Sequence, residues 1–239
     1  GQVDRVLSAG HGAADEVVDA VPTFPGMTEH FAERVSDGHP RRALLKLAGL
    51  LHDVAKPATK TVEETGRIRF LGHHVVGAEV AGEVTSRLRL SGRGSGMVTE
   101  MVRHHLRPSQ MSQPGEMPTP RAVYRYFRDV GDTAIDTVYL NMADYLAAKG
   151  PDIDVQDWRR HCGIMKTIIE LGLASPMNEK APRLVDGRVL MERFGLQPGP
   201  RLGKLLELVD EARATGEIVS ADDALELVRA ELEAGNGVA

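Results

Sequence analysis

Residues 41–57 read RRALLKLAGLLHDVAKP, and their pattern is the strongest indication of the fold class. The leucines, alanines and valine recur at the three- and four-residue spacing of an α-helix and cover most of its circumference. A helix that is apolar on so many sides is predicted to be central and buried, so we expect one at residues 41–56. Pro57 is expected to end it, because the proline ring disfavours helical geometry at the preceding residue.

The rest of the chain shows the same helical spacing. Leucine, alanine, valine and methionine repeat at helical intervals, whereas aromatic residues make up 4% of the sequence, which favours packed helices over a β-sandwich or barrel. The one strand-like stretch, residues 59–70, surrounds turn residues and predicts a small β-hairpin. We therefore predict an all-α fold with a hairpin insertion. Further helices are expected at about residues 75–90, 97–106, 119–130, 134–149 and 155–171.

A break rich in turn-forming residues at 174–182 predicts where the chain divides into domains. Three more helices are expected after it, at residues 185–194, 200–215 and 221–234. We predict an N-terminal domain of residues 1–175 and a helical C-terminal subdomain of residues 183–239. The length of 239 residues and the hydrophobic fraction of 42% suffice for cores of this size.

Composition narrows the classes of function. The chain has no uncharged apolar stretch of about 18 residues and no basic segment followed by an apolar run at its start, so we expect a soluble, cytoplasmic protein without membrane contact. Cys162 is the single cysteine, which excludes a cysteine-based zinc cluster and an intramolecular disulfide. The net charge of −5 argues against a wholly basic nucleic-acid binder.

Clustered histidines are the strongest chemical signal. Five of the nine histidines fall between residues 52 and 105, where an even distribution would place about two. An ionised Asp53 on a buried helix costs several kcal/mol unless it is paired or bound to a metal. The sequence leaves two explanations open, an ion pair with Lys56 or a metal site of imidazole and carboxylate ligands. The clustered histidines are His52, His73, His74, His104 and His105.

Helical phase separates the members of the two histidine pairs. His105 follows apolar residues by three, four and seven positions, and His73 precedes a face of small and apolar residues, so both are expected to point inward. His74 and His104 are expected to point outward or toward a substrate. Asp144, on an otherwise apolar helix, is a further ligand candidate, with an N-cap or ion-pair role as the alternative.

Several motifs together resemble a known family. Residues 50–57 (LLHDVAKP), 70–78 (FLGHHVVGA) and 102–108 (VRHHLRP) resemble the HD-domain superfamily of metal-dependent phosphohydrolases. They look most like the HD domain of one class of bacterial CCA-adding tRNA nucleotidyltransferases, in the poly(A) polymerase family. Residues 186–191 (DGRVLM) and 196–203 (LQPGPRLG) resemble the helical C-terminal part of those enzymes. The resemblance covers about residues 40 to 230.

The resemblance implies an HD-domain helical bundle with one or two divalent metals, which could be Mg, Mn, Ni, Fe or Zn. It implies that His52, Asp53 and Asp144 hold the principal metal, and that His73 and His105 carry the second metal position. Three further residues are expected to touch phosphate or transfer protons, and we assign them as the catalytic candidates. They are Lys56, His74 and His104.

The superfamily has an earlier histidine that completes the first metal site. His30 is one candidate, but it shares a helical face with Glu33, Arg34 and Asp37 and is expected to face solvent. A position near Gln2, or one upstream of Gly1, remains the alternative.

The resemblance also implies a nucleotidyltransferase head, which this chain lacks. Such a head needs a glycine-rich turn followed by paired carboxylates on a strand. Asp152 and Asp154 have the paired form but follow Gly150 and open a helix, so we interpret them as loop and N-cap residues. We expect that this chain alone cannot add CCA. It is either the tail of a larger nucleotidyltransferase or a free-standing relative.

Two functions are consistent with these residues. As an enzyme, the chain would hydrolyse a nucleotide or RNA phosphoester with a divalent metal. As a non-catalytic RNA-binding or structural tail, it would contact RNA phosphates through the arginine-rich segment 85–130, which carries eight arginines and three acidic residues. We favour the enzyme, because five inward metal-type side chains are costly to keep without a metal. The arginines are Arg87, Arg89, Arg93, Arg103, Arg107, Arg121, Arg125 and Arg128.

Overall fold

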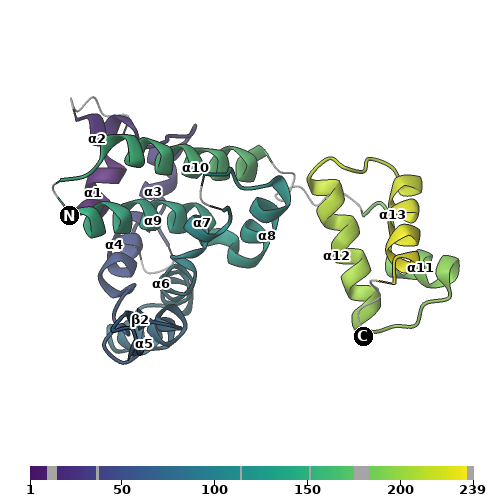
Figure 1. Ribbon diagram of the computed structural model, residues 1–239, viewed down its shortest axis with the longest axis horizontal. Coiled ribbons are helices and arrows are strands. Elements are labelled where there is room, and N and C mark those ends of the chain that lie inside the picture. The colour runs from purple at the N-terminus through teal and green to yellow at the C-terminus, as the bar shows by residue number, and fades with distance from the viewer. Residues whose placement is uncertain (10–14, 36–37, 114, 151, 175–182, 236–239) are drawn as a thin grey trace. The chain divides into compact units, whose positions relative to one another are not determined.

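The computed structural model describes residues 1–9, 15–35, 38–113, 115–150, 152–174 and 183–235. Within these ranges the regular secondary structure is helical apart from a two-stranded hairpin and one isolated bridge, which confirms the predicted all-α fold (Figure 1). The elements, in order, are α1 (Gln2–Leu7), α2 (Glu16–Asp19), α3 (Met27–Ala32), α4 (Arg41–Leu51), β1 (Lys60–Val62), β2 (Ile68–Phe70), α5 (His73–Arg87), α6 (Gly92–His104), α7 (Arg107–Gln110), α8 (Pro120–Val130), the 3-10 turn η1 (Gly131–Thr133), α9 (Ala134–Lys149), α10 (Val155–Ala174), α11 (Gly187–Phe194), α12 (Pro200–Ala214) and α13 (Ala221–Glu233).

The chain forms two compact units. Unit 1 comprises Gly1–Pro118 and Asp129–Glu170, and unit 2 comprises Thr119–Arg128 and Leu171–Ala239. Unit 2 therefore takes in residues 119–128 as well as the C-terminal helices. The predicted domains, 1–175 and 183–239, stay a prediction. The break expected between them lies outside the described residues except for residue 174.

Helix α9 is the centre of unit 1. Eleven of its sixteen residues are buried, and it packs against α1, α4, α6 and α7. Val138, Tyr139 and Met142 are fully buried, since the helix is apolar on nearly all sides. The Tyr139 hydroxyl donates to the carbonyl oxygen of Pro22 at 2.6 Å. The side chains of residues 134–143 on α9 therefore face the protein interior.

Helix α4 is shorter than predicted. It ends at Leu51, and the chain from His52 onward turns through three-residue hydrogen bonds, from the Val54 N–H to the Leu51 carbonyl at 3.0 Å and from the Lys56 N–H to the Asp53 carbonyl at 3.0 Å. The expectation of a helix to residue 56, buried all round, was wrong. Leu50 is 78% exposed, because the apolar pattern cannot distinguish the core from an open face.

The hairpin and the two helices after it place the histidine pairs at helix ends. β1 and β2 pair antiparallel with Thr61 opposite Arg69, which confirms the hairpin. Gly72, in the left-handed region at φ 76°, then caps α5 so that His73 is its first residue. Helix α6 ends at His104, and His105 is its C-cap.

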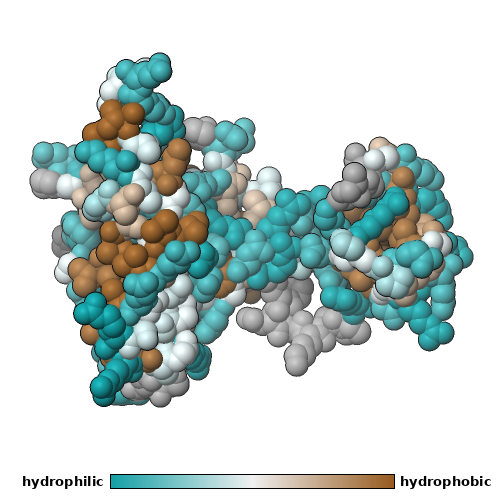
Figure 2. All heavy atoms as spheres, turned by 90° about the horizontal axis from the view of Figure 1, so that it is seen from below, coloured by the Kyte–Doolittle hydropathy of each residue, from teal (hydrophilic) through white to brown (hydrophobic). Residues whose placement is uncertain are grey.

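Unit 2 has its own core, formed by α11, α12 and α13. Leu190, Val209, Ala212, Ala224 and Val228 are almost completely buried in it. Figure 2 shows that, on the face in view, hydrophobic residues lie among hydrophilic ones in each unit. No helix in the described ranges is long and apolar enough to cross a lipid bilayer.

Candidate metal centre

Four segments of unit 1 bring the predicted ligands together. His52 caps the end of α4 and Asp53 follows it, His73 begins α5, His105 caps α6, and Asp144 lies on α9. Helix ends are suited to this task, since a cap residue leaves the cylinder and can direct its side chain toward a neighbouring helix. The five residues form two groups that share Asp53.

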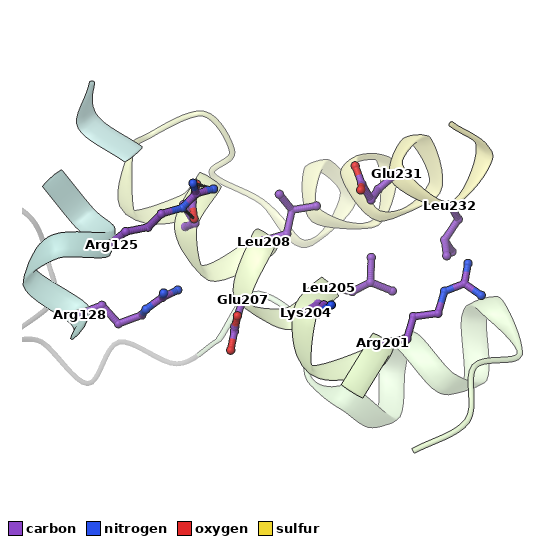
Figure 3. Close-up of a pocket in the computed structure, with 10 residues that line it drawn as sticks. Arg125, Arg128, Arg201, Lys204, Leu205, Glu207, Leu208, Glu231 and Leu232 are labelled. Atoms are coloured by element: carbon purple, nitrogen blue, oxygen red, sulfur yellow. Dashed lines mark hydrogen bonds and ion pairs between the residues drawn. The ribbon is translucent and has the colours of Figure 1, made fainter. Parts of the chain in front are cut away.

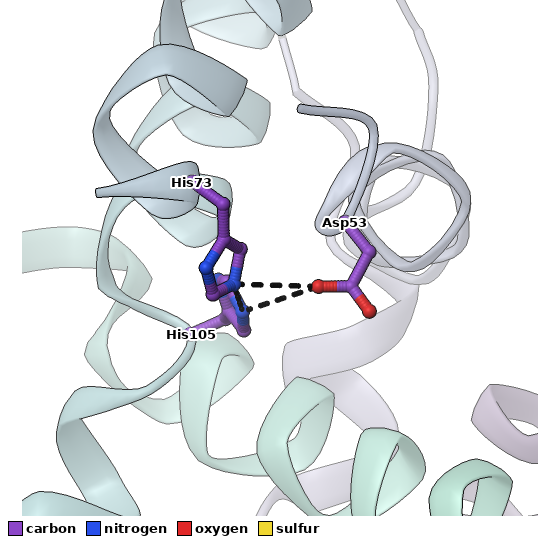
Figure 4. A group of neighbouring side chains, drawn as sticks. All are labelled: Asp53, His73 and His105. Atoms are coloured by element: carbon purple, nitrogen blue, oxygen red, sulfur yellow. Dashed lines mark hydrogen bonds and ion pairs between the residues drawn. The ribbon is translucent and has the colours of Figure 1, made fainter. Parts of the chain in front are cut away.

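The first group consists of Asp53, His73 and His105 (Figure 4). Asp53 Oδ1 lies 3.4 Å from His73 Nε2 and 3.9 Å from His105 Nε2, and the two Nε2 atoms are 3.4 Å apart. Asp53 Oδ1 is buried and has no hydrogen-bond partner among the described residues. A buried carboxylate oxygen without a partner requires an explanation, and a cation supplies one.

The ring orientations in this group are fixed by the backbone. His73 Nδ1 donates to the Phe70 carbonyl and His105 Nδ1 donates to the Val102 carbonyl, both at 2.7 Å. In a neutral ring this bond directs the Nε2 lone pair away from the backbone, toward Asp53. Burial lowers the pKa of His105 to about 4, so its ring is neutral at pH 7. Two imidazole nitrogens and a carboxylate oxygen therefore converge as electron-pair donors.

The second group consists of His52, Asp53 and Asp144. His52 Nε2 lies 3.2 Å from Asp53 Oδ2 and 3.2 Å from Asp144 Oδ1, while its Nδ1 donates to the Gly49 carbonyl at 2.9 Å. Burial opposes the charged form of His52, but the hydrogen bonds to Asp144 and Asp53 raise its pKa to about 10. Without a metal, the imidazolium thus supplies the positive charge between two carboxylates.

The pKa values of the two carboxyl groups shift downward, whereas that of His52 shifts upward. Burial alone would raise the pKa of Asp53 and Asp144, but hydrogen bonds from His52 lower it in both, and Lys56 contributes at Asp53. Both carboxylates are therefore ionised at neutral pH. Ionised carboxylates and imidazoles suit borderline divalent metals, and His52 would release its proton on binding one, so the residues present fit a metal.

Of the three predicted catalytic candidates, Lys56 lies beside Asp53 and His74 beside His73, while His104 directly precedes His105 in the chain. Lys56 Nζ contacts Asp53 Oδ2 at 2.6 Å, so the ion pair foreseen as the alternative to a metal is present. His104 Nε2 lies 3.2 Å from Glu100 Oε2, and His74 Nδ1 is a buried atom without a partner in the described chain. Both rings are half-buried, whereas His73 and His105 are 7% and 0% exposed, which confirms the predicted inward members of each pair.

His30 lies elsewhere, and the expectation that it faces solvent was wrong. Its Nε2 is 3.3 Å from Asp136 Oδ2, its side chain is 21% exposed, and its ring packs edge-on against Phe24 and Phe31. The helical phase used for the prediction failed because α3 ends at Ala32, so the residues after it do not continue the same face. His30 belongs to neither group of candidate ligands.

Sequence reasoning missed a buried charge network around Arg41. This side chain, 3% exposed, donates to Asp136 Oδ2 at 2.9 Å, Glu33 Oε2 at 2.6 Å and Asp132 Oδ1 at 2.5 Å. Asp136 is completely buried on α9, two turns before Asp144. An acidic residue on an apolar helix was the available signal, as it was for Asp144.

Two further features were predicted from the sequence, the carboxylate pair at residues 152 and 154 and the arginine-rich segment 85–130. Asp154 accepts the backbone N–H groups of Gln156 and Asp157 at 2.8 and 3.0 Å, which confirms the N-cap interpretation. The arginines of residues 85–130 divide between the units, with Arg121, Arg125 and Arg128 in unit 2.

A pocket of about 340 Å³ in unit 2 contains part of this arginine segment (Figure 3). Arg125 and Arg128 line it together with Arg201, Lys204, three leucines and three glutamates. Buried Glu211 accepts two hydrogen bonds from Arg125, at 2.7 and 2.9 Å. The protein itself therefore neutralises part of the positive charge.

The fold and the site together define a class of protein: an all-α helical domain in which three histidines and two aspartates lie close enough to hold a metal. The family model described as the HD domain matches residues 26–149, and this chain belongs to the HD-domain family. The matched range contains all five candidate ligands.

Curated relatives extend the similarity beyond the matched domain. The chain is 34% identical over 181 residues to the CC-adding tRNA nucleotidyltransferase of Thermus thermophilus, covering 75% of this chain and 38% of the relative. It is 32% identical over 187 residues to the A-adding tRNA nucleotidyltransferase of Deinococcus radiodurans, covering 78% and 41%. A bifunctional uridylyltransferase/uridylyl-removing enzyme of Ectopseudomonas mendocina is 28% identical over 139 residues, which is 57% of this chain and 14% of that relative. The chain thus spans about two fifths of the tRNA nucleotidyltransferases it matches.

Proposed function

We propose that this chain is a metal-dependent phosphohydrolase domain that acts on a nucleotide or RNA phosphoester. One observation carries the proposal: the Nε2 atoms of His73 and His105 converge on the unpartnered Oδ1 of Asp53, next to the His52–Asp144 pair. Such a donor set is costly to bury without a cation. The tRNA nucleotidyltransferases among the relatives support a substrate of this kind.

The proposed ligands divide the work between the two groups. His52, Asp53 and Asp144 would hold the principal divalent metal, and His73 and His105 a second one through the shared Asp53. A bound divalent metal supplies Lewis acidity, which makes water a better nucleophile at neutral pH and offsets charge on the phosphoryl oxygens. With the metal in place, the positive charge on His52 is no longer needed between the two carboxylates.

The three catalytic candidates would bind phosphate and transfer protons. The Lys56 ammonium, which forms an ion pair with Asp53, can also donate a hydrogen bond to a phosphoryl oxygen. Burial lowers the pKa of His74, and the positive charge of Arg103 lowers it further. Burial likewise lowers the pKa of His104, although Glu100 opposes the shift. Both rings are therefore mainly neutral at pH 7 and able to accept a proton.

Elemental analysis of protein purified without added ions tests the first half of the proposal. We expect one or two equivalents of a divalent metal, followed by hydrolysis of phosphomonoesters or phosphodiesters when Mn, Ni, Mg or Zn is supplied. A chelator should abolish the activity. As a control, His39→Ala removes an exposed histidine outside the site, so this variant should keep the metal content and activity of the wild type.

RNA binding without catalysis is the alternative proposal. Contacts through the arginines would survive chelation and weaken steeply with salt, because phosphate contacts release counterions. The ion pairs of Arg121 with Glu217, Arg125 with Glu211 and Arg107 with Asp129 reduce the charge available for RNA. Tight, salt-dependent and chelator-resistant RNA binding without hydrolysis would favour this alternative.

A further inference from the structure

A cavity of about 380 Å³ opens beside the candidate metal centre in unit 1. Helices α1, α4 and α9 form its walls, and His52 and Asp144 lie on its lining. This cavity therefore adjoins the ligand group that would hold the principal metal.

Apolar and small side chains make most of the walls. Val3, Leu50 and Leu140 supply apolar surface, and Leu50 is the 78%-exposed leucine at the end of α4. Gly49 allows α1 to approach α4, since a Cβ there would lie 3.1 Å from Val3 Cγ2 and 3.6 Å from Leu140 Cδ1. Such a surface suits the faces of a flat ring rather than a chain of charged groups.

Polar groups stand at two places in the cavity. The half-buried side-chain amide of Gln2 makes no hydrogen bond within the described residues. An amide presents a donor and an acceptor side by side, the pattern that pairs with the edge of a nucleobase. Lys46 and Asp4 form an ion pair on the same lining and offer further partners for hydroxyl groups.

We propose that this cavity receives the nucleoside part of a nucleoside phosphate, with the phosphate directed to His52 and Asp144. The inference rests on the proposed phosphohydrolase function and specifies its substrate class. The volume of the cavity equals that of roughly a dozen water molecules and lies near the lower end of the range for small-molecule pockets, so the cavity suits a single nucleoside. That nucleoside can belong to a free nucleotide or to the end of a nucleic-acid strand.

Nucleoside binding to the metal-free full chain tests the cavity without requiring hydrolysis. Adenosine, cytidine, guanosine and uridine are titrated by calorimetry against the wild type, Ala147→Phe and Ala148→Phe. Both alanines are exposed on α9, but only Ala147 lines the cavity. We expect one or more nucleosides to bind, a loss of affinity of at least tenfold in Ala147→Phe, and a change within twofold in Ala148→Phe.

A second variant keeps the test independent of the phenylalanine substitutions. Gln2→Ala should weaken the preferred nucleoside at least threefold, and in the wild type the side-chain amide signals of Gln2 should shift in NMR spectra as nucleoside is added. Competition with a nucleoside 5′-monophosphate and with a short oligoribonucleotide then distinguishes the two sources. A strand end competes through the oligoribonucleotide, whereas a free-nucleotide site responds to the monophosphate alone.

The failures of the two proposals differ. Absence of nucleoside binding at millimolar concentration, or equal binding by Ala147→Phe and the wild type, overturns the cavity assignment even if metal-dependent hydrolysis is found. Binding that Ala147→Phe abolishes, in a protein without hydrolysis under any metal, supports the cavity and refutes the phosphohydrolase.

Discussion

Replacing Asp53 by asparagine is the most direct test of the candidate metal centre. Asp53 is the carboxylate shared by both ligand groups, so the variant leaves each group with two of its three members. Losing a residue that merely orients a ligand typically weakens metal binding 10- to 100-fold. Loss of a shared ligand should therefore weaken it at least 100-fold, about 2.7 kcal/mol.

The assay is metal content by elemental analysis after dialysis, followed by titration of the metal-free protein. Asp152→Asn is the matched control, because Asp152 is an exposed carboxylate outside both groups. The variant should keep its fold, since Lys56 is 40% exposed and can remain solvated when its partner is lost. Asp53→Asn protein that retains a full equivalent of metal with wild-type affinity would refute the assignment.

Three further expectations follow from the same contacts. His73→Ala should reduce metal occupancy more than His74→Ala does, and His105→Ala more than His104→Ala. Equal losses within a pair would show that both of its members bind. Arg41→Ala should lower the free energy of unfolding in urea by about 3–5 kcal/mol, because it leaves buried Asp136 without its cation. In metal-free protein, the stability that His52 contributes should be complete below about pH 6.5 and disappear as the pH rises through about 10, since its pKa is raised on folding.

Each of these expectations has a control or a contrary result. Arg42→Ala, at the exposed neighbour, should change stability by less than about 0.5 kcal/mol in the same urea experiment. For the pH dependence, His52→Gln should flatten the stability profile between pH 7 and 10. A profile identical to that of the wild type would show that the imidazolium does not stabilise the metal-free fold.

Local periodicity predicted the helices, because each helix is specified by residues three and four apart. The ends were less predictable. Residues 52–56 continue the apolar pattern of α4, yet the chain leaves the helix at Leu51 and closes in tighter turns. Helical phase identified His73 and His105 as the buried members of their pairs, since both lie within one turn of a helix that does form.

Contacts between distant residues were beyond the reach of the sequence. Arg41 and Asp136 are 95 positions apart, and nothing local to either one indicates the pair. The same limit explains His30, whose partner Asp136 is 106 positions away. The candidate ligands were recognisable because their motifs resemble a family, while the ring contacts among them depend on how four segments pack.

Three histidines of the site share one local device, in which Nδ1 bonds the carbonyl three residues earlier: His52 to Gly49, His73 to Phe70 and His105 to Val102. Each ring is thus oriented by the backbone three residues before it, independently of the others. The rotational freedom of these rings is lost when the chain folds, so little of it remains to be lost when an ion arrives. Because the carbonyl that orients His73 belongs to Phe70, which follows the turn at residues 63–67, we expect this turn to change in length without reorienting the imidazole.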